Sequence, residues 1–535
     1  MTNSIDDLGQ ADVILVIGSN TTEAHPIIGI ELKKAAQRGT RIFVVDPRRI
    51  RLTRHAEKWL PVEPGANVAL INAMMRIIIE EGLADEEFIS ARTEGFEAVR
   101  ELVKDYDLEW AAEVTGLTVD EIRDVAIAYG SAGAASIVYA MGVTQHETGT
   151  QQVRAVANLA MLTGNIGRPG TGVNPLRGQN NVQGACDLAC LPNCLPGYQQ
   201  LSDRGTLDRF CDYWETEREL STESGLTLVE MMDAAVAGEL RAMYIMGENP
   251  VIADPDQAHV LEALESLDFL VVQDIFMTET ASLADVVLPG ASFLEKDGTF
   301  TNTDRRIKRT HKIIDSPGDA LTDGEIIVRL SHLLGIDDEY ASASEVMIEM
   351  SSVTPQYGGV TYRRLEAEGE IRWPCPDESH PGTPILHVER FTRGLGEFAP
   401  VDYIPPAEKT DAERTLILTT GRHLWNFHTN TMTRRSSGLS ELNDHGYLEM
   451  NPADARDLGI CNGDTVEVTS AHGSVEAEAR VIRESAPKRG VVFMPFHFAD
   501  APANRLTAAN LDPTAKIPGL KVTAVRVHKV NSQQA

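Results

Sequence analysis

Residues 11–46 read ADVILVIGSNTTEAHPIIGIELKKAAQRGTRIFVVD, the pattern of a strand, a helix and a second strand. The apolar run at 11–18 ends in Gly18 and is typical of a buried strand. Helical spacing from His25 to Arg38 then ends at a glycine, which is a common helix stop. The second apolar run ends at Asp46, before a proline. Such a unit of about 35 residues predicts a βαβ crossover in a parallel sheet.

A second unit of the same kind lies later in the chain. An apolar run at 242–247 ends in Gly247, residues 257–266 have helical spacing, and a run at 269–274 ends in Asp274. Glycine lets the backbone approach a phosphate, and a strand-end carboxylate can accept ribose hydroxyls or guanine N–H groups. Neither unit carries GxGxxG, so an ordinary NAD fold is not indicated. Either unit alone is most simply an α/β sheet with ordinary glycine turns, but their recurrence favours two nucleotides, or two ends of one.

The C-terminal part has a different sequence pattern. Short apolar runs alternate with turn residues at 415–420, 464–470, 474–482, 490–496 and 521–527, which predicts a small β-barrel. We therefore predict an α/β protein with two Rossmann-like nucleotide-binding units plus a C-terminal β-barrel. The expected segments are a first α/β dinucleotide-binding domain at 1–177, a second α/β domain at 178–351, a connecting segment at 352–410 and the barrel at 411–535.

Composition and charge exclude several classes of function. The 535 residues hold 48 Lys and Arg against 79 Asp and Glu, a net charge of −31, which repels nucleic acid and anionic membranes. We expect no nucleic-acid partner, and no apolar run approaches the ~20 residues of a membrane span. The N-terminus lacks the basic region of a secretion signal, and six cysteines suit a reducing, cytoplasmic location. The acidity itself is explained by a solvated surface and says nothing about the reaction.

Three cysteines have a spacing that invites a metal-cluster interpretation. Cys186, Cys190 and Cys194 form CxxxCxxxC, but they offer only three ligands, so structural or free thiols are favoured. The other three cysteines are isolated. We predict no metal bound directly by a residue of this chain.

Several longer strings are far more specific than either unit. They are GSNTTEAHP (18–26), VDPR (45–48), GVTQH (142–146), LTGNIG (162–167), RGQNNVQGACD (177–187), QDIFMTETA (273–281), EKDGTFTN (295–302) and TGR (420–422). In this order they resemble the large (alpha) subunit of formate dehydrogenases, within the molybdopterin oxidoreductase superfamily. The resemblance covers nearly the whole chain, from residue 3 to about 528.

The resemblance implies a bis-molybdopterin guanine dinucleotide (bis-MGD) cofactor around Mo or W, shared by the two units and the barrel. Glycine turns, backbone N–H groups and strand-end carboxylates suit its two pyrophosphates and two guanines. By position in the motifs, one nucleotide site would comprise Gly18, Asn20, Glu23, Asp46 and Arg48, and the other Gly247, Asp274, Thr278 and Thr280. Further cofactor residues would be Gly142, Gln145, Asn181, Gly421, Arg422, His428, Thr429, Asn510 and Lys521.

The loop at 177–183 carries the candidate catalytic residues closest to the chemistry. Within the family string, Arg177 would be a fixed cation that holds the formate carboxylate and orients its C–H bond. Gln179 and Asn181 could bond pterin or substrate oxygen. An isolated loop arginine more often satisfies backbone carbonyls, and His146, the third candidate catalytic residue, is more often structural. The implied reaction is the oxidation of formate to carbon dioxide, two electrons and a proton.

The resemblance also shows what this chain lacks. The family normally begins with an iron–sulfur domain that holds a 4Fe–4S cluster, followed by a Cys or selenocysteine ligand to the metal. A truncated chain is therefore expected, through a misplaced start, a stop codon read as selenocysteine or a split gene. Activity of the chain alone is then uncertain, and electrons would leave through the missing segment and an iron–sulfur partner subunit.

Two alternatives to a formate dehydrogenase remain. A sibling molybdoenzyme, such as a nitrate reductase, would share the dinucleotide sites and differ around 142–183. A non-catalytic scaffold, like the large iron–sulfur subunit of respiratory complex I, would carry no molybdenum and no pterin. The intact RGQNN string at 177–181 argues against a scaffold, since a scaffold need not retain an anion site.

Overall fold

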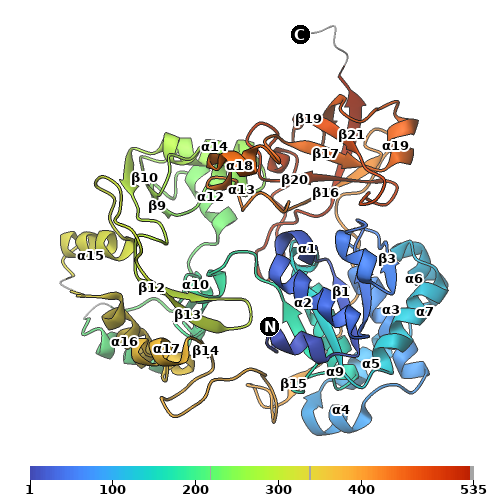
Figure 1. The fold of residues 1–535 in the computed structure, drawn as a ribbon, viewed down its shortest axis with the longest axis horizontal. Coiled ribbons are helices and arrows are strands. Elements are labelled where there is room, and N and C mark those ends of the chain that lie inside the picture. The colour runs from blue at the N-terminus through green and yellow to red at the C-terminus, as the bar shows by residue number, and fades with distance from the viewer. Residues whose placement is uncertain (217–218, 337–338, 531–535) are drawn as a thin grey trace. The chain divides into compact units, whose positions relative to one another are not determined.

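The computed structural model describes residues 1–216, 219–336 and 339–530 (Figure 1). The chain forms two compact units: unit 1 comprises Met1–Leu176, Val251–Val260 and Ile385–Ala535, and unit 2 comprises Arg177–Pro250 and Leu261–Pro384. In the described ranges, no helix combines the length and apolar character needed to cross a membrane.

Unit 1 contains a five-stranded parallel sheet that confirms the first predicted βαβ unit. Its strand order is β3-β2-β1-β5-β6, and Val13 of β1 pairs with Arg41 on one side and Ala135 on the other. Alternate residues of β1 enter two different cores: Ile14 and Val16 pack with α2, while the other three pack with α3, α7 and α9. The bounds are β1 Val13–Ile17, β2 Arg41–Val45, β3 Lys58–Leu60, β5 Ala135–Tyr139, β6 Gly172–Pro175, α2 Pro26–Gln37, α3 Asn67–Glu80, α7 Val119–Gly130 and α9 Gly149–Leu162.

The C-terminal part of unit 1 is a closed barrel with the strand order β16-β20-β17-β19-β18-β21. The five predicted barrel strands are present, together with a sixth, β17, that the sequence did not predict. This strand is only four residues long and holds an acid, Glu449, so it shows no apolar alternation. The bounds are β16 Leu416–Gly421, β17 Tyr447–Met450, β18 Thr465–Thr469, β19 Ser474–Val481, β20 Val491–Pro495 and β21 Thr523–Lys529.

Unit 2 holds the second predicted set of strands. A parallel sheet has the order β11-β10-β9, and an antiparallel sheet has the order β12-β13-β14. Its helices include α15, α16 and α17, and Tyr357 and Leu365 lie in the core beside β13 and β14. The bounds are β9 Ala242–Met246, β10 Phe269–Asp274, β11 Val286–Pro289, β12 Gly298–Thr301, β13 Arg306–Thr310, β14 Ile371–Arg372, α15 Asp323–Leu333, α16 Ala343–Val353 and α17 Tyr362–Glu368.

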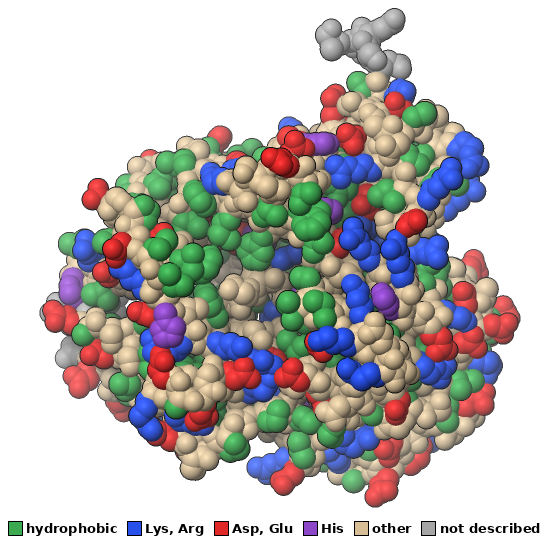
Figure 2. Space-filling view, viewed as in Figure 1, with side chains coloured by type: hydrophobic (Ala, Val, Ile, Leu, Met, Phe, Trp, Pro, Cys, Tyr) green, Lys and Arg blue, Asp and Glu red, His purple; other side chains and the backbone are tan. Residues whose placement is uncertain are grey.

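The string at 177–187 and the predicted connecting segment at 352–410 each contain a short helix. Helix α10 (Val182–Asp187) lies inside the glycine-rich string at 177–187, and α17 lies in the segment at 352–410. Both helices are shorter than the window in which helical periodicity becomes legible. On the face of the molecule drawn in Figure 2, acidic and basic side chains are interspersed, as expected of a solvated surface.

Candidate functional site

Two glycines bring the ends of β1 and β5 into direct backbone contact. Gly18 has a φ of +56°, and its carbonyl accepts the N–H of Gly142 at 3.0 Å. A Cβ atom on Gly142 would lie 2.6 Å from the Gly18 Cα, which is too close for any side chain. The Gly142 carbonyl also accepts Asn67 Nδ2 at 3.2 Å and lies 3.0 Å from His146 Nε2. Both predicted glycines therefore hold the strand-end turn of the first nucleotide-type unit.

A group of buried polar atoms follows this turn. Ser19 Oγ, Asn20 Nδ2, Thr21 Oγ1 and Glu23 Oε2 are buried and have no hydrogen-bond partner among the described residues. Asn20 uses its other side-chain atom, Oδ1, to accept the Thr22 hydroxyl at 3.1 Å. Buried polar atoms are paired in most native structures, so a cluster of unpaired ones is typical of a site that a polar ligand fills.

Asp46 and Arg48 lie at the end of the neighbouring strand and are both 8% exposed. Asp46 Oδ1 accepts the Arg48 N–H at 2.8 Å, and the Arg48 guanidinium lies 3.5 Å above the Phe493 ring. Arg48 Nη2 pairs with Glu449 Oε2 at 2.7 Å. Burial raises the pKa of the Asp46 carboxyl to about 6, against the opposing effect of the Arg48 N–H. The barrel thus supplies a carboxylate and a ring to a residue of the α/β sheet.

Two more cations come from the barrel, of which Lys521 is buried and Arg422 is half-buried. Lys521 Nζ donates to the Thr420 carbonyl at 2.8 Å, and burial lowers the pKa of Lys521 to about 7, with the positive charge of Arg422 adding to the shift. Burial also lowers the pKa of Arg422 to about 10. Gly421 lies between Thr420 and Arg422 in sequence, and a Cβ there would sit 2.8 Å from the Phe493 ring. Desolvated cations that repel one another are stabilised by a bound anion.

The histidines of the barrel end are held neutral. Burial lowers the pKa of His428 to about 4 and that of His497 to about 3. The His423 N–H donates to His497 Nε2 at 2.8 Å, so His497 carries its proton on Nδ1 and donates it to the His428 carbonyl. The Thr429 hydroxyl is 3.0 Å from that of Thr431. These groups contribute hydrogen-bonding capacity without further charge.

The remaining predicted residues of unit 1 have mainly structural contacts. The Gln145 carbonyl accepts the Leu520 N–H at 3.0 Å, which ties the loop after β5 to the barrel. Burial lowers the pKa of His146 to about 4, and the ring lines a small cavity with Gly65, Glu147, Pro406 and Gly519. Asn510 is exposed and donates from Nδ2 to Glu147 Oε1 at 2.9 Å. Burial therefore favours the neutral imidazole of His146, and its catalytic role stays a prediction.

The Arg177 loop belongs to unit 2, where β12 and the turn after it hold it in place. The Arg177 N–H donates to Thr303 Oγ1 at 3.0 Å, and Asn181 Oδ1 accepts the Thr301 N–H at 2.9 Å. Arg177 Nε donates to Gln183 Oε1 at 3.3 Å. Gln179 lies half-buried in the same loop. Both ends of the predicted catalytic string are therefore fixed by side chains and backbone of one unit.

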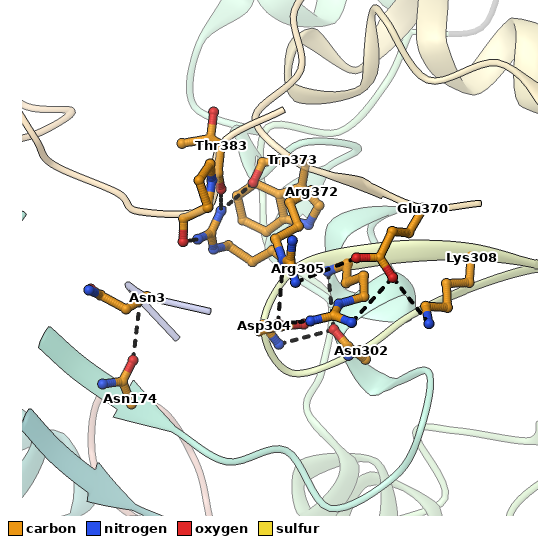
Figure 3. A network of polar contacts seen from close by, with 12 residues as sticks. Asn3, Asn174, Asn302, Asp304, Arg305, Lys308, Glu370, Arg372, Trp373 and Thr383 are labelled. Atoms are coloured by element: carbon orange, nitrogen blue, oxygen red, sulfur yellow. Dashed lines mark hydrogen bonds and ion pairs between the residues drawn. The ribbon is translucent and has the colours of Figure 1, made fainter. Parts of the chain in front are cut away.

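The turn that receives this loop lies in a network of ion pairs and hydrogen bonds (Figure 3). Asp304 is fully buried and pairs with Arg306 at 3.0 Å and Arg372 at 3.4 Å. Arg305 has a φ of +65° and donates from Nη1 to the carbonyls of Trp373 and Thr383. Burial lowers the pKa of Arg305 to about 10. The arginine cluster therefore ties the β12–β13 turn to the segment that follows α17.

The second nucleotide-type unit repeats the geometry of the first. Gly247 ends β9 with a φ of +64° and donates its N–H to the Gln273 carbonyl at 2.8 Å. Asp274 Oδ1 accepts the Phe276 N–H at 3.1 Å, and Thr278 Oγ1 accepts the Ala281 N–H at 3.0 Å. Thr280 donates from its hydroxyl to Asn249 Oδ1 at 2.7 Å. These residues form a connected strand-end turn.

Some site residues were missed from the sequence. In unit 1 they are Thr420, Glu449, Phe493 and His497, and in unit 2 they are Glu248, Asn249 and Gln183. A signal existed for Glu248 and Asn249, because GEN at 247–249 stands where GSN stands at 18–20. Burial raises the pKa of Glu248, and the nearby Asp274 charge adds to this. The four residues of unit 1 gain their roles through contacts that only the fold creates, whereas Gln183 contacts residues near it in the chain.

The cysteines are free thiols, and the described residues contain no candidate metal site. Cys186, Cys190 and Cys194 are free thiols, half-buried, exposed and buried respectively. Over the part of the chain that the structure describes, no group of three or more His, Cys, Asp or Glu side chains is placed to hold a metal ion.

Comparisons with known proteins agree with this architecture. The family described as "Molybdopterin oxidoreductase" matches residues 1–333, and the "Molydopterin dinucleotide binding domain" matches residues 416–524. The "F420-dependent formate dehydrogenase subunit alpha" of Methanocaldococcus jannaschii is 51% identical over 99% of this chain and 78% of its own length. The "Assimilatory nitrate reductase catalytic subunit" of Bacillus subtilis is more distant, at 33% identity over 98% of this chain and 76% of its own.

A solved structure shares the fold. "Acetylene Hydratase from Pelobacter acetylenicus" matches 98% of this chain and 81% of its own with a TM-score of 0.76 at 20% identity. With two family profiles matched and a relative half identical along nearly the whole chain, this protein belongs to the molybdopterin oxidoreductase family, in which it resembles formate dehydrogenase alpha subunits.

Proposed function

We propose that this chain binds bis-MGD and, in the assembled enzyme, oxidises formate to carbon dioxide. The observation that carries the proposal is the cation cluster in unit 1 of the buried Arg48 and Lys521 with the half-buried Arg422. Glu449, Glu23 and Asp46 all favour the charged form of Arg48, whereas Lys521 is destabilised as a cation by burial and by Arg422. A pyrophosphate would remove that cost, because an opposite charge favours the protonated lysine.

The polar residues of the first unit fit the rest of such a cofactor. The unpartnered atoms of Asn20, Glu23 and Ser19 offer both donors and acceptors for a guanine or a ribose. In unit 2, Gly247, Asp274, Thr278 and Thr280 would serve the second nucleotide, with Asn249 holding Thr280 in place. The cofactor supplies the two-electron redox chemistry when it is bound, through Mo or W.

Arg177 is the proposed binding residue for formate. A guanidinium pairs with a carboxylate through two parallel N–H groups, so it fixes the plane of the substrate as well as its position. The tie of its backbone to Thr303 limits where the side chain can reach. Gln179 and Asn181 would complete the polar lining of the loop. The names of the relatives support formate as the anion.

The partners and the location form part of the same proposal. We expect the metal's Cys or selenocysteine ligand and a 4Fe–4S cluster to belong to a segment that precedes residue 1. Electrons would pass from there to an iron–sulfur subunit in the cytoplasm. The strong negative charge of this chain repels nucleic acid and anionic membranes, so neither is a proposed partner.

The test uses the purified holoenzyme. We expect molybdenum or tungsten and two guanine nucleotides per chain after acid release, together with formate oxidation and no nitrate reduction. Arg177→Ala should lower kcat/KM for formate by about 100-fold or more, as for loss of a charged hydrogen-bonding group in a reacting site. Activity with nitrate but not formate would identify the sibling enzyme. Protein without metal and pterin would contradict the cofactor proposal and favour the scaffold.

A further inference from the structure

A buried chain of hydrogen bonds links the Arg177 guanidinium to the carboxylate of Asp187. Arg177 Nε donates to Gln183 Oε1 at 3.3 Å, and Gln183 Nε2 donates to Asp187 Oδ1 at 2.8 Å. Gln183 is 5% exposed and Asp187 is 1% exposed. The two residues are four apart on α10, so the helix places their side chains on one face.

Two tyrosines anchor the far end of this chain. The Tyr198 hydroxyl donates to Asp187 Oδ1 at 2.8 Å, and the Tyr357 hydroxyl donates to Asp187 Oδ2 at 2.8 Å. Burial raises the pKa of Asp187, and the bonds from Gln183 and the two tyrosines oppose that rise. The Asp187 carboxylate therefore accepts three hydrogen bonds, and both of its oxygens take part.

The arrangement sets the orientation of the Gln183 amide. Its Nε2 faces Asp187 Oδ1 and the Tyr198 oxygen, which is 3.1 Å away. The Tyr198 hydroxyl donates its own hydrogen bond to Asp187, so its oxygen accepts one from the amide. An ionised carboxylate only accepts hydrogen bonds, so the amide nitrogen must face it. The amide oxygen is then turned toward Arg177. A flipped amide would instead present a donor to the guanidinium, which can only donate.

We propose that Gln183 and Asp187 are positioning residues that hold the Arg177 guanidinium in the orientation that receives a small carboxylate ligand. Arg177 is fixed at its backbone by Thr303 and at Nε by Gln183. The plane of a guanidinium sets the plane of the carboxylate it binds and hence the direction of the C–H bond. The inference rests on the proposed function for what Arg177 binds, and it adds the residues that orient it.

Kinetics of the holoenzyme give the first test. Gln183→Met keeps the length of the side chain and removes the three hydrogen bonds of the amide, to Arg177, Asp187 and Tyr198. We expect the KM for formate to rise about ten-fold or more while kcat changes less than about three-fold, in line with loss of one bond to a charged group. Asp187→Asn should raise the KM as well. Because Asp187 acts through Gln183, Asp187→Asn should add less than about two-fold in the Gln183→Met background.

A second readout needs neither cofactor nor turnover. In the cofactor-free chain, the Nε–H signal of Arg177 can be identified in an arginine-selective ¹⁵N spectrum by its loss in Arg177→Lys. We expect Gln183→Met to speed its exchange with water by about three-fold or more and to shift its resonance, because the acceptor is gone. The control is Gln356→Met, the same change at a glutamine whose Nε2 donates to the Gly197 carbonyl at 2.8 Å. It should leave both the Nε–H signal and the KM unchanged.

The outcomes separate the possible failures. Unchanged Nε–H exchange in Gln183→Met would overturn the inference at its first step. A changed Nε–H with an unchanged KM, while Arg177→Lys does raise the KM, would also overturn it, because the bond would then be structural only. If the wild-type holoenzyme does not oxidise formate, the proposed function fails by itself, and the Nε–H exchange still tests whether Gln183 holds Arg177.

Discussion

At the scale of single residues, the first site depends on glycines that no other residue can replace. Gly18 and Gly142 meet through backbone atoms, and Gly421 leaves room for the ring on which Arg48 stacks. Each of these glycines had a sequence signal, since each stands at the end of an apolar run or in a specific string. Each position requires glycine because of an atom that lies close to it in the fold, and the sequence did not reveal that atom.

Gly142→Ala should destabilise the cofactor-free chain by roughly 2–4 kcal/mol, because a Cβ 2.6 Å from the Gly18 Cα forces two backbones apart. Urea denaturation measures the loss. Gly438→Ala is the control, as it lies in a short helix with open space around it and should change stability by less than about 1 kcal/mol. Equal effects of the two substitutions would contradict the close approach of the two glycines.

At the scale of elements, β17 joins the barrel to the α/β sheet within unit 1. Glu449 of β17 pairs with Arg48 at 2.7 Å, and their side chains are 8% and 9% exposed. The carboxylate raises the pKa of Arg48 against the lowering effect of burial. An ion pair this deep makes its two members interdependent, since either one alone would be a buried charge.

Glu449→Leu should therefore cost roughly 3–5 kcal/mol of stability in the cofactor-free chain, measured by urea denaturation. Adding Arg48→Met should recover much of that loss, because the uncompensated charge is then removed. The matched control is the exposed pair of Arg54 and Glu484, which joins the same two parts of unit 1. Glu484→Leu should cost less than about 1 kcal/mol. Additive effects of Glu449→Leu and Arg48→Met would refute the coupling.

At the scale of the whole molecule, the cofactor site makes stability depend on pH. Lys521 has a folded pKa of about 7 against 10.5 ordinarily, so between these values the unfolded chain binds the proton more tightly. Stability of the cofactor-free chain should accordingly rise from pH 7 to pH 10 through this group. A bound anion would raise the folded pKa of Lys521 and so remove this rise, because it favours the protonated lysine.

The measurement compares the wild type with Lys521→Met, so that the general effect of the net charge of −31 cancels. In the cofactor-free chain, the difference in unfolding free energy between the two proteins should change in favour of the wild type as pH rises from 7 to 10. In the holoenzyme that change should disappear or invert. A difference that is flat over this range without cofactor would show that Lys521 is not a desolvated cation.

Local sequence was sufficient for the strands of the two predicted βαβ units, the strand-end glycines and the specific strings, because periodicity and glycine conformation act within a few residues. It was sufficient for five barrel strands but not for β17, whose buried acid breaks the apolar pattern. The pairing of Arg48 with Glu449, the repulsion between Arg422 and Lys521, and the bonds from Tyr357 to Asp187 became visible only in the folded chain. These contacts join residues about 100 to 401 positions apart, and packing rather than local preference brings such residues together.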